Sequence, residues 1–114
     1  MLKVKRVYEP AEPDDGYRIL VDRLWPRGLS RSKAKADLWL KEIAPSNTLR
    51  KCYGHEPEKW EEFKKKYSAE LATKKALLDQ IKQVEKQRRV VTLLFGTRAT
   101  EYNNAIALKE FLDR

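Results

Sequence analysis

The sequence predicts an α/β fold: a small, mostly parallel sheet of about four strands flanked by helices, in a single domain over residues 1–114. Two short apolar runs, Ile19–Val21 and Val90–Phe95, have the continuous hydrophobicity of strands buried on both faces. Stripes of apolar residues at helical spacing lie between these runs and after them. A chain of 114 residues is large enough for one hydrophobic core but not for two.

In the first half of the chain we expect a strand, a loop, a second strand, a short helix and a third strand. These cover residues 2–8, 9–16, 17–21, 30–35 and 38–43 in turn. The first strand alternates apolar and basic side chains, which suits an edge position with one buried face. Ser30 can cap the short helix. Leu38–Ile43 is ambiguous between strand and helix, and we favour a strand because Ala44-Pro45-Ser46 ends it abruptly.

In the second half we expect three helices, a strand and a last helix. These cover residues 46–54, 57–71, 77–89, 90–95 and 101–112 in turn. Ser46 can cap the first of these helices, which carries Leu49, Cys52 and Tyr53 on one side. The second helix has an amphipathic stripe, because its apolar residues recur at spacings of three and four. Residues 90–95 form the clearest strand, and its β-branched start is typical of a central parallel strand.

The composition favours an anionic partner in a reducing compartment. Lys and Arg number 25 against 17 Asp and Glu, a formal net charge of +8. This charge suits nucleic acid or a small molecule bearing phosphate or carboxylate groups. The single cysteine excludes an internal disulfide. No segment approaches the roughly 20 apolar residues of a membrane span, and the N-terminus has no signal-peptide pattern. We therefore expect a cytoplasmic protein with no membrane partner; its oligomeric state is not indicated.

The first candidate site follows the central strand. Ligands of open α/β sheets bind beyond the carboxyl ends of the strands. There the sequence places Asp22, Arg23, Trp25 and Arg27, in a turn fixed by a proline and a glycine. Arg23 and Arg27 can clamp an anion, and Asp22 can orient a guanidinium or act as a general base. Trp25 can stack on a base or a sugar. The alternatives are a structural ion pair and an aromatic that anchors the loop.

A second candidate site follows the strand at residues 90–95. Thr97 and Arg98 lie in its exit loop, which resembles a phosphate-receiving loop. Asn103 and Asn104 fall in the first turns of the last helix, where local hydrogen bonds to the backbone are the alternative to ligand contact. Ser46 follows a third predicted strand and can donate its hydroxyl to the same anion.

If the strands run parallel and close together, Arg23 or Arg27 should face Arg98 across one cleft. The loop at residues 96–98 has neither the GxGxxG nor the Walker A pattern, so no cofactor is predicted.

The sequence also weighs against a metal centre and a cysteine enzyme. His55 is the only histidine and precedes a helix, where a structural hydrogen bond is the alternative to catalysis. One His and one Cys cannot fill a tetrahedral metal site in one chain. Residues 55–59 depart from the HExxH pattern, because position 59 is Lys. Cys52 is expected to be a small core residue rather than a nucleophile.

Basic runs occur at four places in the chain, namely Arg31–Lys35, Lys64–Lys66, Lys74-Lys75 and Arg88-Arg89. Such runs usually mark solvated helix faces, but they can also bind the phosphate backbone of nucleic acid. No helix-turn-helix, zinc-finger or RNA-recognition pattern accompanies them. Weak, non-specific binding of nucleic acid is therefore the alternative to a small anionic ligand.

Three sequence blocks resemble the DUF488 family, the small bacterial proteins of the YeaO type. They are VDRLWPRG, LWLKEIAPSNTLRKCYGHEPEKWEEF and LLFGTRATEYNNAIALKEFL, and the resemblance covers essentially the whole chain. The positions that match the family pattern are Asp22, Arg23, Trp25, Pro26, Arg27, Gly28, Ala44, Pro45, Ser46, Leu49, His55, Pro57, Trp60, Phe63 and Asn103.

The chain departs from that pattern at two positions, Cys52 in place of an aromatic residue and Tyr102 in place of a frequent histidine. The second departure weakens any mechanism that needs a histidine at position 102. The resemblance implies no particular activity, because the family is defined by sequence. Whether the protein is an enzyme is left open.

Overall fold

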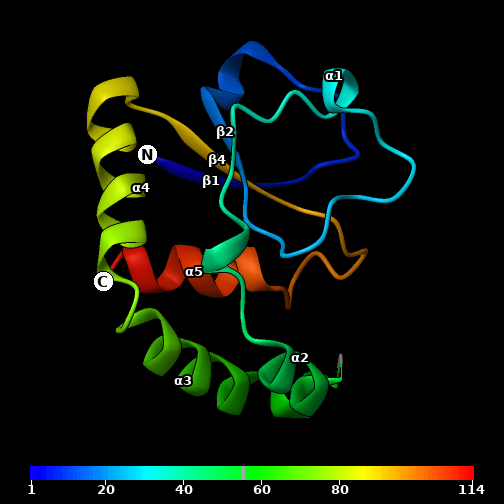
Figure 1. The fold of residues 1–114 in the computed structure, drawn as a ribbon, viewed down its shortest axis with the longest axis vertical. Coiled ribbons are helices and arrows are strands. Elements are labelled where there is room, and N and C mark those ends of the chain that lie inside the picture. Colours follow the sequence, from blue (N-terminus) through cyan, green and yellow to red (C-terminus); the bar gives the residue numbers. More distant parts are fainter. Residues whose placement is uncertain (55) are drawn as a thin grey trace.

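A computed structural model describes residues 1–54 and 56–114, and His55 lies outside them. Within the described residues, four strands form one all-parallel sheet (Figure 1). The strands are β1 (Leu2–Arg6), β2 (Tyr17–Leu20), β3 (Leu38–Trp39) and β4 (Val91–Phe95), in the spatial order β1-β4-β2-β3. The predicted α/β class is confirmed.

Five α-helices and three short 3₁₀-helices connect the strands in the described part of the chain. The α-helices are α1 (Arg31–Ala34), α2 (Asn47–Tyr53), α3 (Trp60–Leu71), α4 (Lys75–Arg88) and α5 (Asn104–Leu112). The 3₁₀-helices are η1 (Pro13–Asp15), η2 (Lys41–Ile43) and η3 (Pro57–Lys59). Ser30 and Ser46 cap α1 and α2 as predicted, since each side-chain oxygen accepts a hydrogen bond from a backbone N–H three residues on.

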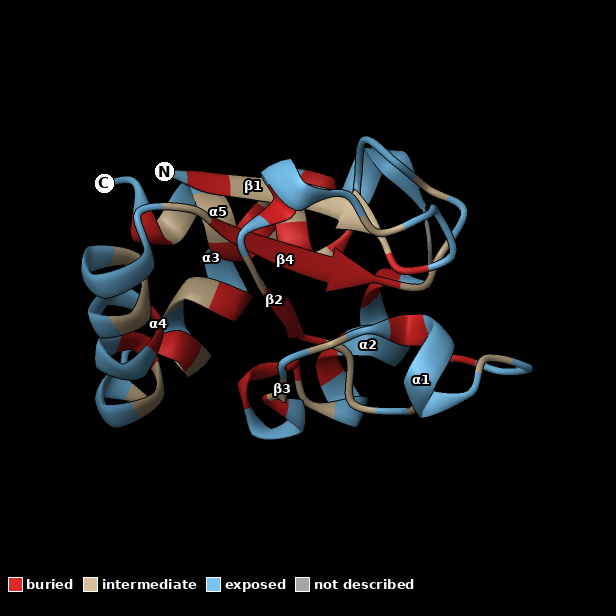
Figure 2. Ribbon diagram, turned by 90° about the horizontal axis from the view of Figure 1, so that it is seen from above, coloured by how far each residue is buried: buried red, intermediate tan, exposed pale blue. Residues whose placement is uncertain are grey.

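β4 lies in the middle of the sheet, between β1 and β2. Leu93 is in register with Val4 on one side and with Ile19 on the other. All five residues of β4 are buried, so the strand is red along its whole length in Figure 2. This explains its continuous apolar sequence, because a central parallel strand meets other parts of the protein on both faces.

Each face of the sheet has its own hydrophobic cluster. On one face, the side chains of Ile19 and Leu93 join a large cluster with the inward residues of α2, α3, α4 and α5. Leu20 and Leu94 belong to a smaller cluster on the opposite face, where Trp25 and Trp39 pack against it. Among the described residues, the one α-helix that contributes to this second cluster is α1, which has four residues.

Three predictions about individual elements are wrong in detail. The strand expected at residues 38–43 ends at Trp39, and η2 follows, because Tyr67 and Lys74 donate hydrogen bonds to the carbonyl groups of residues 43 and 42. Cys52 is exposed instead of buried, since α2 turns Leu49 and Tyr53 inward, four residues apart. The last helix begins at Asn104 and not at residue 101.

In the described residues, no helix combines the length and the apolar character needed to cross a membrane.

Candidate functional site

A cavity of about 460 Å³ opens at the carboxyl edge of the sheet. The segments that follow β2 and β4 line it, together with the residues before α2, α2 itself and the start of α5. The wall combines a carboxylate, three cationic side chains and three aromatic rings: Asp22, Arg23, Arg50, Lys51, Tyr53, Phe63 and Tyr102. A ligand in this position would bind where parallel α/β sheets usually bind ligands.

Asp22 forms hydrogen bonds that connect the segments after β2 and β4 with the start of α5. Its Oδ2 accepts a hydrogen bond from the backbone N–H of Gly96 at 2.8 Å, just beyond β4. Its Oδ1 accepts one from Nδ2 of Asn104 at 3.2 Å, and the same amide nitrogen donates to the carbonyl of Val21 at 3.0 Å. The side chain of Asp22 therefore fixes the relative positions of the β2 exit, the β4 exit and the first turn of α5.

The surroundings of Asp22 disfavour its charged form. Burial raises the pKa of this carboxyl group above its usual value, because the charged form loses its hydration. The hydrogen bonds from Asn104 and Gly96 and the positive charge of Arg50 act in the opposite direction without cancelling the effect of burial. A carboxylate that is costly to keep charged can bind a proton, or a hydrogen-bond donor supplied by a ligand.

Arg23 lines the same cavity, and its side chain contacts the segment before α2. Its guanidinium donates to the carbonyl of Ala44 at 3.1 Å, and a second nitrogen lies 3.9 Å from the carboxylate of Glu42. Lys74 donates to the same Ala44 carbonyl at 3.1 Å. Nε of Arg23 is buried and has no hydrogen-bond partner among the described residues. Two cations thus share one carbonyl.

Arg50 and Lys51 supply the cations that sequence reasoning missed. Both lie on α2 and line the cavity, although charged residues on a short amphipathic helix usually face only solvent. The signal that could have found them was the cap at Ser46, which starts α2 directly after a strand exit. The aromatic part of the wall was also missed, because Tyr53 and Phe63 were assigned to the core alone.

Five of the nine predicted site residues line the cavity: Asp22, Arg23, Thr97, Asn103 and Asn104. Thr97 accepts the backbone N–H of residue 99, and Asn103 caps α5 by accepting the N–H of residue 106. The local hydrogen bonds that were the alternative at Asn103 are therefore present. They leave its side chain at the cavity wall while it also positions α5.

The structure places the other four predicted residues elsewhere. Trp25 packs on the opposite face of the sheet, where its ring meets Trp39 edge-on at 5.3 Å and its N–H donates to residue 29. The hydroxyl of Ser46 donates to Glu70 at 2.6 Å, and Ser46 is not in the described cavity lining. Arg27 and Arg98 are exposed. Among the described residues, Arg23 is thus the one member of the expected arginine triad that lines the cavity.

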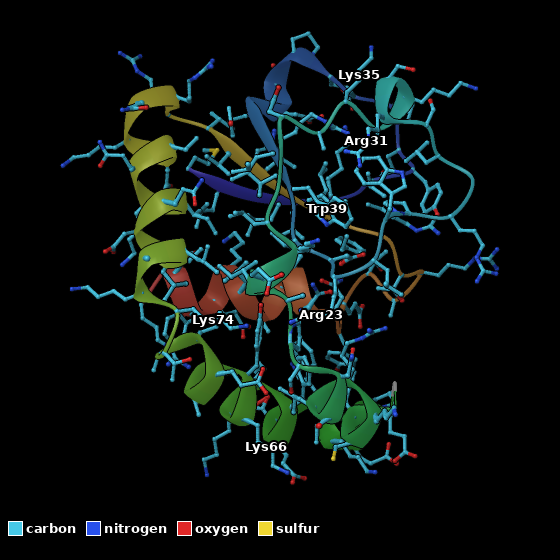
Figure 3. The ribbon with its side chains drawn as sticks, viewed as in Figure 1. Arg23, Arg31, Lys35, Trp39, Lys66 and Lys74 are labelled. Carbon is cyan, nitrogen blue, oxygen red and sulfur yellow. The ribbon has the colours of Figure 1, made fainter. Side chains whose placement is uncertain are left out.

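The basic runs lie on separate parts of the surface. Figure 3 shows Arg31 and Lys35 beside α1, at the opposite end of the molecule from Lys66 on α3. Lys66 pairs with Glu62 at 2.9 Å, and its neighbour Lys64 pairs with two carboxylates. The described runs therefore do not form one continuous positive face. In the same part of the chain, no group of three or more His, Cys, Asp or Glu residues is arranged to hold a metal ion.

The fold and the cavity define a small α/β protein with a charged, aromatic-walled pocket at the carboxyl edge of a parallel sheet. The chain belongs to the DUF488-N3i family, described as the inactive DUF488-N3 subclade, whose family model matches residues 1–114. The predicted resemblance is therefore confirmed.

Full-length bacterial relatives agree with this assignment. The uncharacterized protein YeaO of Escherichia coli (strain K12) is 42% identical over 111 residues, which cover 97% of this chain and 96% of that protein. The uncharacterized protein Rv3073c of Mycobacterium tuberculosis (strain ATCC 25618 / H37Rv) is 40% identical over 112 residues, which cover 98% of this chain and 93% of that protein. No solved structure matches the chain significantly.

Proposed function

We propose that the protein binds a small anionic ligand, phosphate- or nucleotide-like, in the cavity at the carboxyl edge of its sheet. The observation that carries this proposal is the charge of the cavity wall, whose described lining has three cations, Arg23, Arg50 and Lys51, and a single carboxylate, Asp22. Guanidinium groups suit phosphate and carboxylate because they donate in a planar fork. A cavity of about 460 Å³ lies within the range of small-molecule sites, which is about 300–1,000 Å³.

Binding fits this cavity better than catalysis does. The matched family is described as inactive. Asp22, the candidate base, already uses both oxygens to hold the strand exits together. This structural role accounts for the buried carboxylate without a proton-transfer step, and each oxygen can still accept a hydrogen bond from a ligand.

Nucleic-acid binding through the basic helices is the second candidate and ranks lower. It needs the lysine and arginine runs to lie on one surface, whereas Lys35 and Lys66 lie at opposite ends of the view in Figure 3. Two lysines of α3, Lys64 and Lys66, also form ion pairs with carboxylates of the same chain. A protein with this charge distribution should bind random duplex DNA weakly, with an affinity that falls as salt rises.

Thermal unfolding with added anions tests the proposal. Phosphate, sulfate and nucleotides are each added to the wild type, to Arg50→Gln and to Arg98→Gln. Both arginines are exposed, but of the two only Arg50 lines the cavity. A ligand at 100 times its dissociation constant adds about 2.7 kcal/mol of stability, a rise in Tm on the order of 10 °C. Arg50→Gln should lose most of this gain, and Arg98→Gln should keep it.

Arg23→Gln and Arg27→Gln form a second matched pair, since Arg23 lines the cavity and Arg27 is exposed on the loop beyond it. Two results would contradict the proposal. One is a wild type that no anion stabilises. The other is equal behaviour of the cavity variants and their controls, because the gain would then come from general screening of the positive charge.

A further inference from the structure

The cavity wall has aromatic rings and a carboxylate, which an inorganic anion would not need. Besides its cations, the cavity wall has the aromatic side chains Tyr53, Phe63 and Tyr102. The rings of Tyr53 and Phe63 lie 4.8 Å apart, and Tyr102 lies 5.1 Å from Trp60, which stacks on Phe63. Mutual packing holds these rings in place, and Tyr102, which is exposed, offers its ring to a ligand ring. Base–aromatic stacking is a common use of such a surface.

Asp22 is the second feature that a simple anion does not explain. A carboxylate repels an anion bound nearby, yet Asp22 lines the cavity. An ionised carboxylate has about four lone-pair positions, and Asp22 uses one on each oxygen, for Gly96 and for Asn104. Each oxygen therefore retains an acceptor position. Two adjacent N–H donors on a ligand would satisfy both oxygens at once and repay the cost of burying the charge.

We propose that the ligand is a nucleoside monophosphate with two adjacent N–H donors on its base, as in guanine, and that Asp22 accepts them while Arg50 and Lys51 bind the phosphate. The inference rests on the proposed anion site and names the class of ligand for it. In guanine the ring N–H and the amino group are adjacent donors. In adenine the ring nitrogen beside the amino group is an acceptor, which would face a carboxylate oxygen and be rejected.

The cavity-lining residues come from different segments of the chain, which supports binding of a ligand with two different polar groups. Arg50 and Lys51 come from α2, whereas Asp22 lies at the exit of β2 and Tyr102 precedes α5. Arg50 is near enough to influence the charge of Asp22, so the cation and the carboxylate belong to one electrostatic environment. Because Arg50 and Lys51 come from another segment than Asp22, one ligand can present its anionic group to them and its donor edge to Asp22.

Calorimetric titration at pH 7 tests the inference with four probes: inorganic phosphate, AMP, IMP and GMP. The wild type should bind GMP most tightly, IMP less tightly because it has one donor, and AMP at least about tenfold more weakly than GMP. Asp22→Asn should weaken GMP by tenfold or more. The same change should leave phosphate binding equal or stronger, since it removes a negative charge from the cavity.

Tyr102→Ala tests the aromatic surface and has a matched control. Tyr102 is 38% exposed and lines the cavity, whereas Tyr8 is 39% exposed and is no part of its described lining. Tyr102→Ala should weaken GMP several-fold without affecting phosphate, and Tyr8→Ala should affect neither.

The outcomes separate the two proposals. If no probe binds, the anion site itself is wrong. If phosphate binds and loses affinity in Arg50→Gln, but AMP, IMP and GMP bind the wild type equally, the anion site stands and recognition of the base by Asp22 is overturned. The comparison of nucleotides uses the wild type alone, so it decides the matter even if Asp22→Asn fails to fold.

Discussion

The two faces of the β sheet are covered in different ways, although both are fully buried at the centre. Leu93 and Leu94 are neighbours in β4, neither is exposed to solvent, and they point to opposite faces. Leu93 packs within a cluster built from four helices. Leu94 packs under loop segments, the four-residue α1 and two tryptophans. One face is thus stabilised mainly by apolar packing, and the other depends on polar contacts that hold loops in place.

A buried polar network stabilises the loop-covered face of the sheet. The guanidinium of Arg18 pairs with the carboxylate of Asp15 and donates to the carbonyls of Ala34 and Lys35 at 2.8 and 3.0 Å. The hydroxyl of Thr92 donates to the carbonyl of Asp15 at 2.6 Å. Arg18 and Asp15 are 4% and 3% exposed. Because each backbone group in this network belongs to a loop or a short helix, the network replaces the packing that a long helix would provide.

Truncating Leu93 should have the largest effect, and comparing it with truncation of Leu94 should separate the two faces. Leu93→Ala should cost about 4–5 kcal/mol of unfolding free energy, because the surrounding helices cannot close the cavity. Leu94→Ala should cost about 2–3 kcal/mol, since loops can relax into the space. Urea unfolding monitored by circular dichroism measures both. Equal costs would show that the loop-covered face is as rigid as the other.

Removing Asp15 should be the next largest effect. Asp15→Ala leaves Arg18 buried without its carboxylate, and such changes cost about 3–4 kcal/mol. Burial raises the pKa of Asp15, but hydrogen bonds from the backbone of Glu12 and from Lys5 and Arg18 outweigh it, so the pKa lies below the usual 3.8. A lowered pKa stabilises the folded state above about pH 4, and this contribution is lost as pH falls through the folded value.

The wild type should therefore lose more stability than Asp15→Ala when pH falls from 5 to 2. Urea unfolding at a series of pH values gives this difference directly. Parallel curves for the two proteins would mean that Asp15 contributes nothing through its charge.

The same comparison explains what the sequence could and could not predict. The helix-covered face follows from periodicity, so the stripe through Trp60, Phe63 and Tyr67 identified α3, and the run at residues 90–95 identified β4. The polar network was not foreseen, because nothing local in the sequence shows that Arg18 in a strand is buried. Tertiary hydrogen bonds likewise converted residues 41–43 from strand to η2.

The candidate site also has residues that the sequence could predict and residues that it could not. Asp22, Arg23 and Asn104 were predictable, because the direction of parallel strands places their exits at one edge. Trp25 was not, since the turn after Arg23 carries the chain to the other face of the sheet, where Trp25 meets Trp39. To predict Arg50 as a cavity residue, one would need to know which side of α2 faces the cavity. The three apolar residues of α2 indicate this orientation only roughly.

The pH dependence of anion binding should be the smallest effect. Burial raises the pKa of Asp22, so its negative charge disappears at a higher pH than that of an ordinary aspartate. As pH falls toward that value, repulsion of a bound anion weakens, and sulfate affinity should rise by about three- to tenfold. Sulfate is the suitable probe because it does not itself titrate in this range. Calorimetry on the wild type should show the rise, and Asp22→Asn should show a flat profile.

A crystal structure grown with inorganic phosphate tests the central claim most directly. We predict phosphate in the cavity at the sheet edge, within hydrogen-bond distance of Arg23 or Arg50 and on the helix-covered side of the sheet. Phosphate bound instead beside α1 and its basic residues, with the cavity empty, would contradict the assignment of this cavity as the binding site.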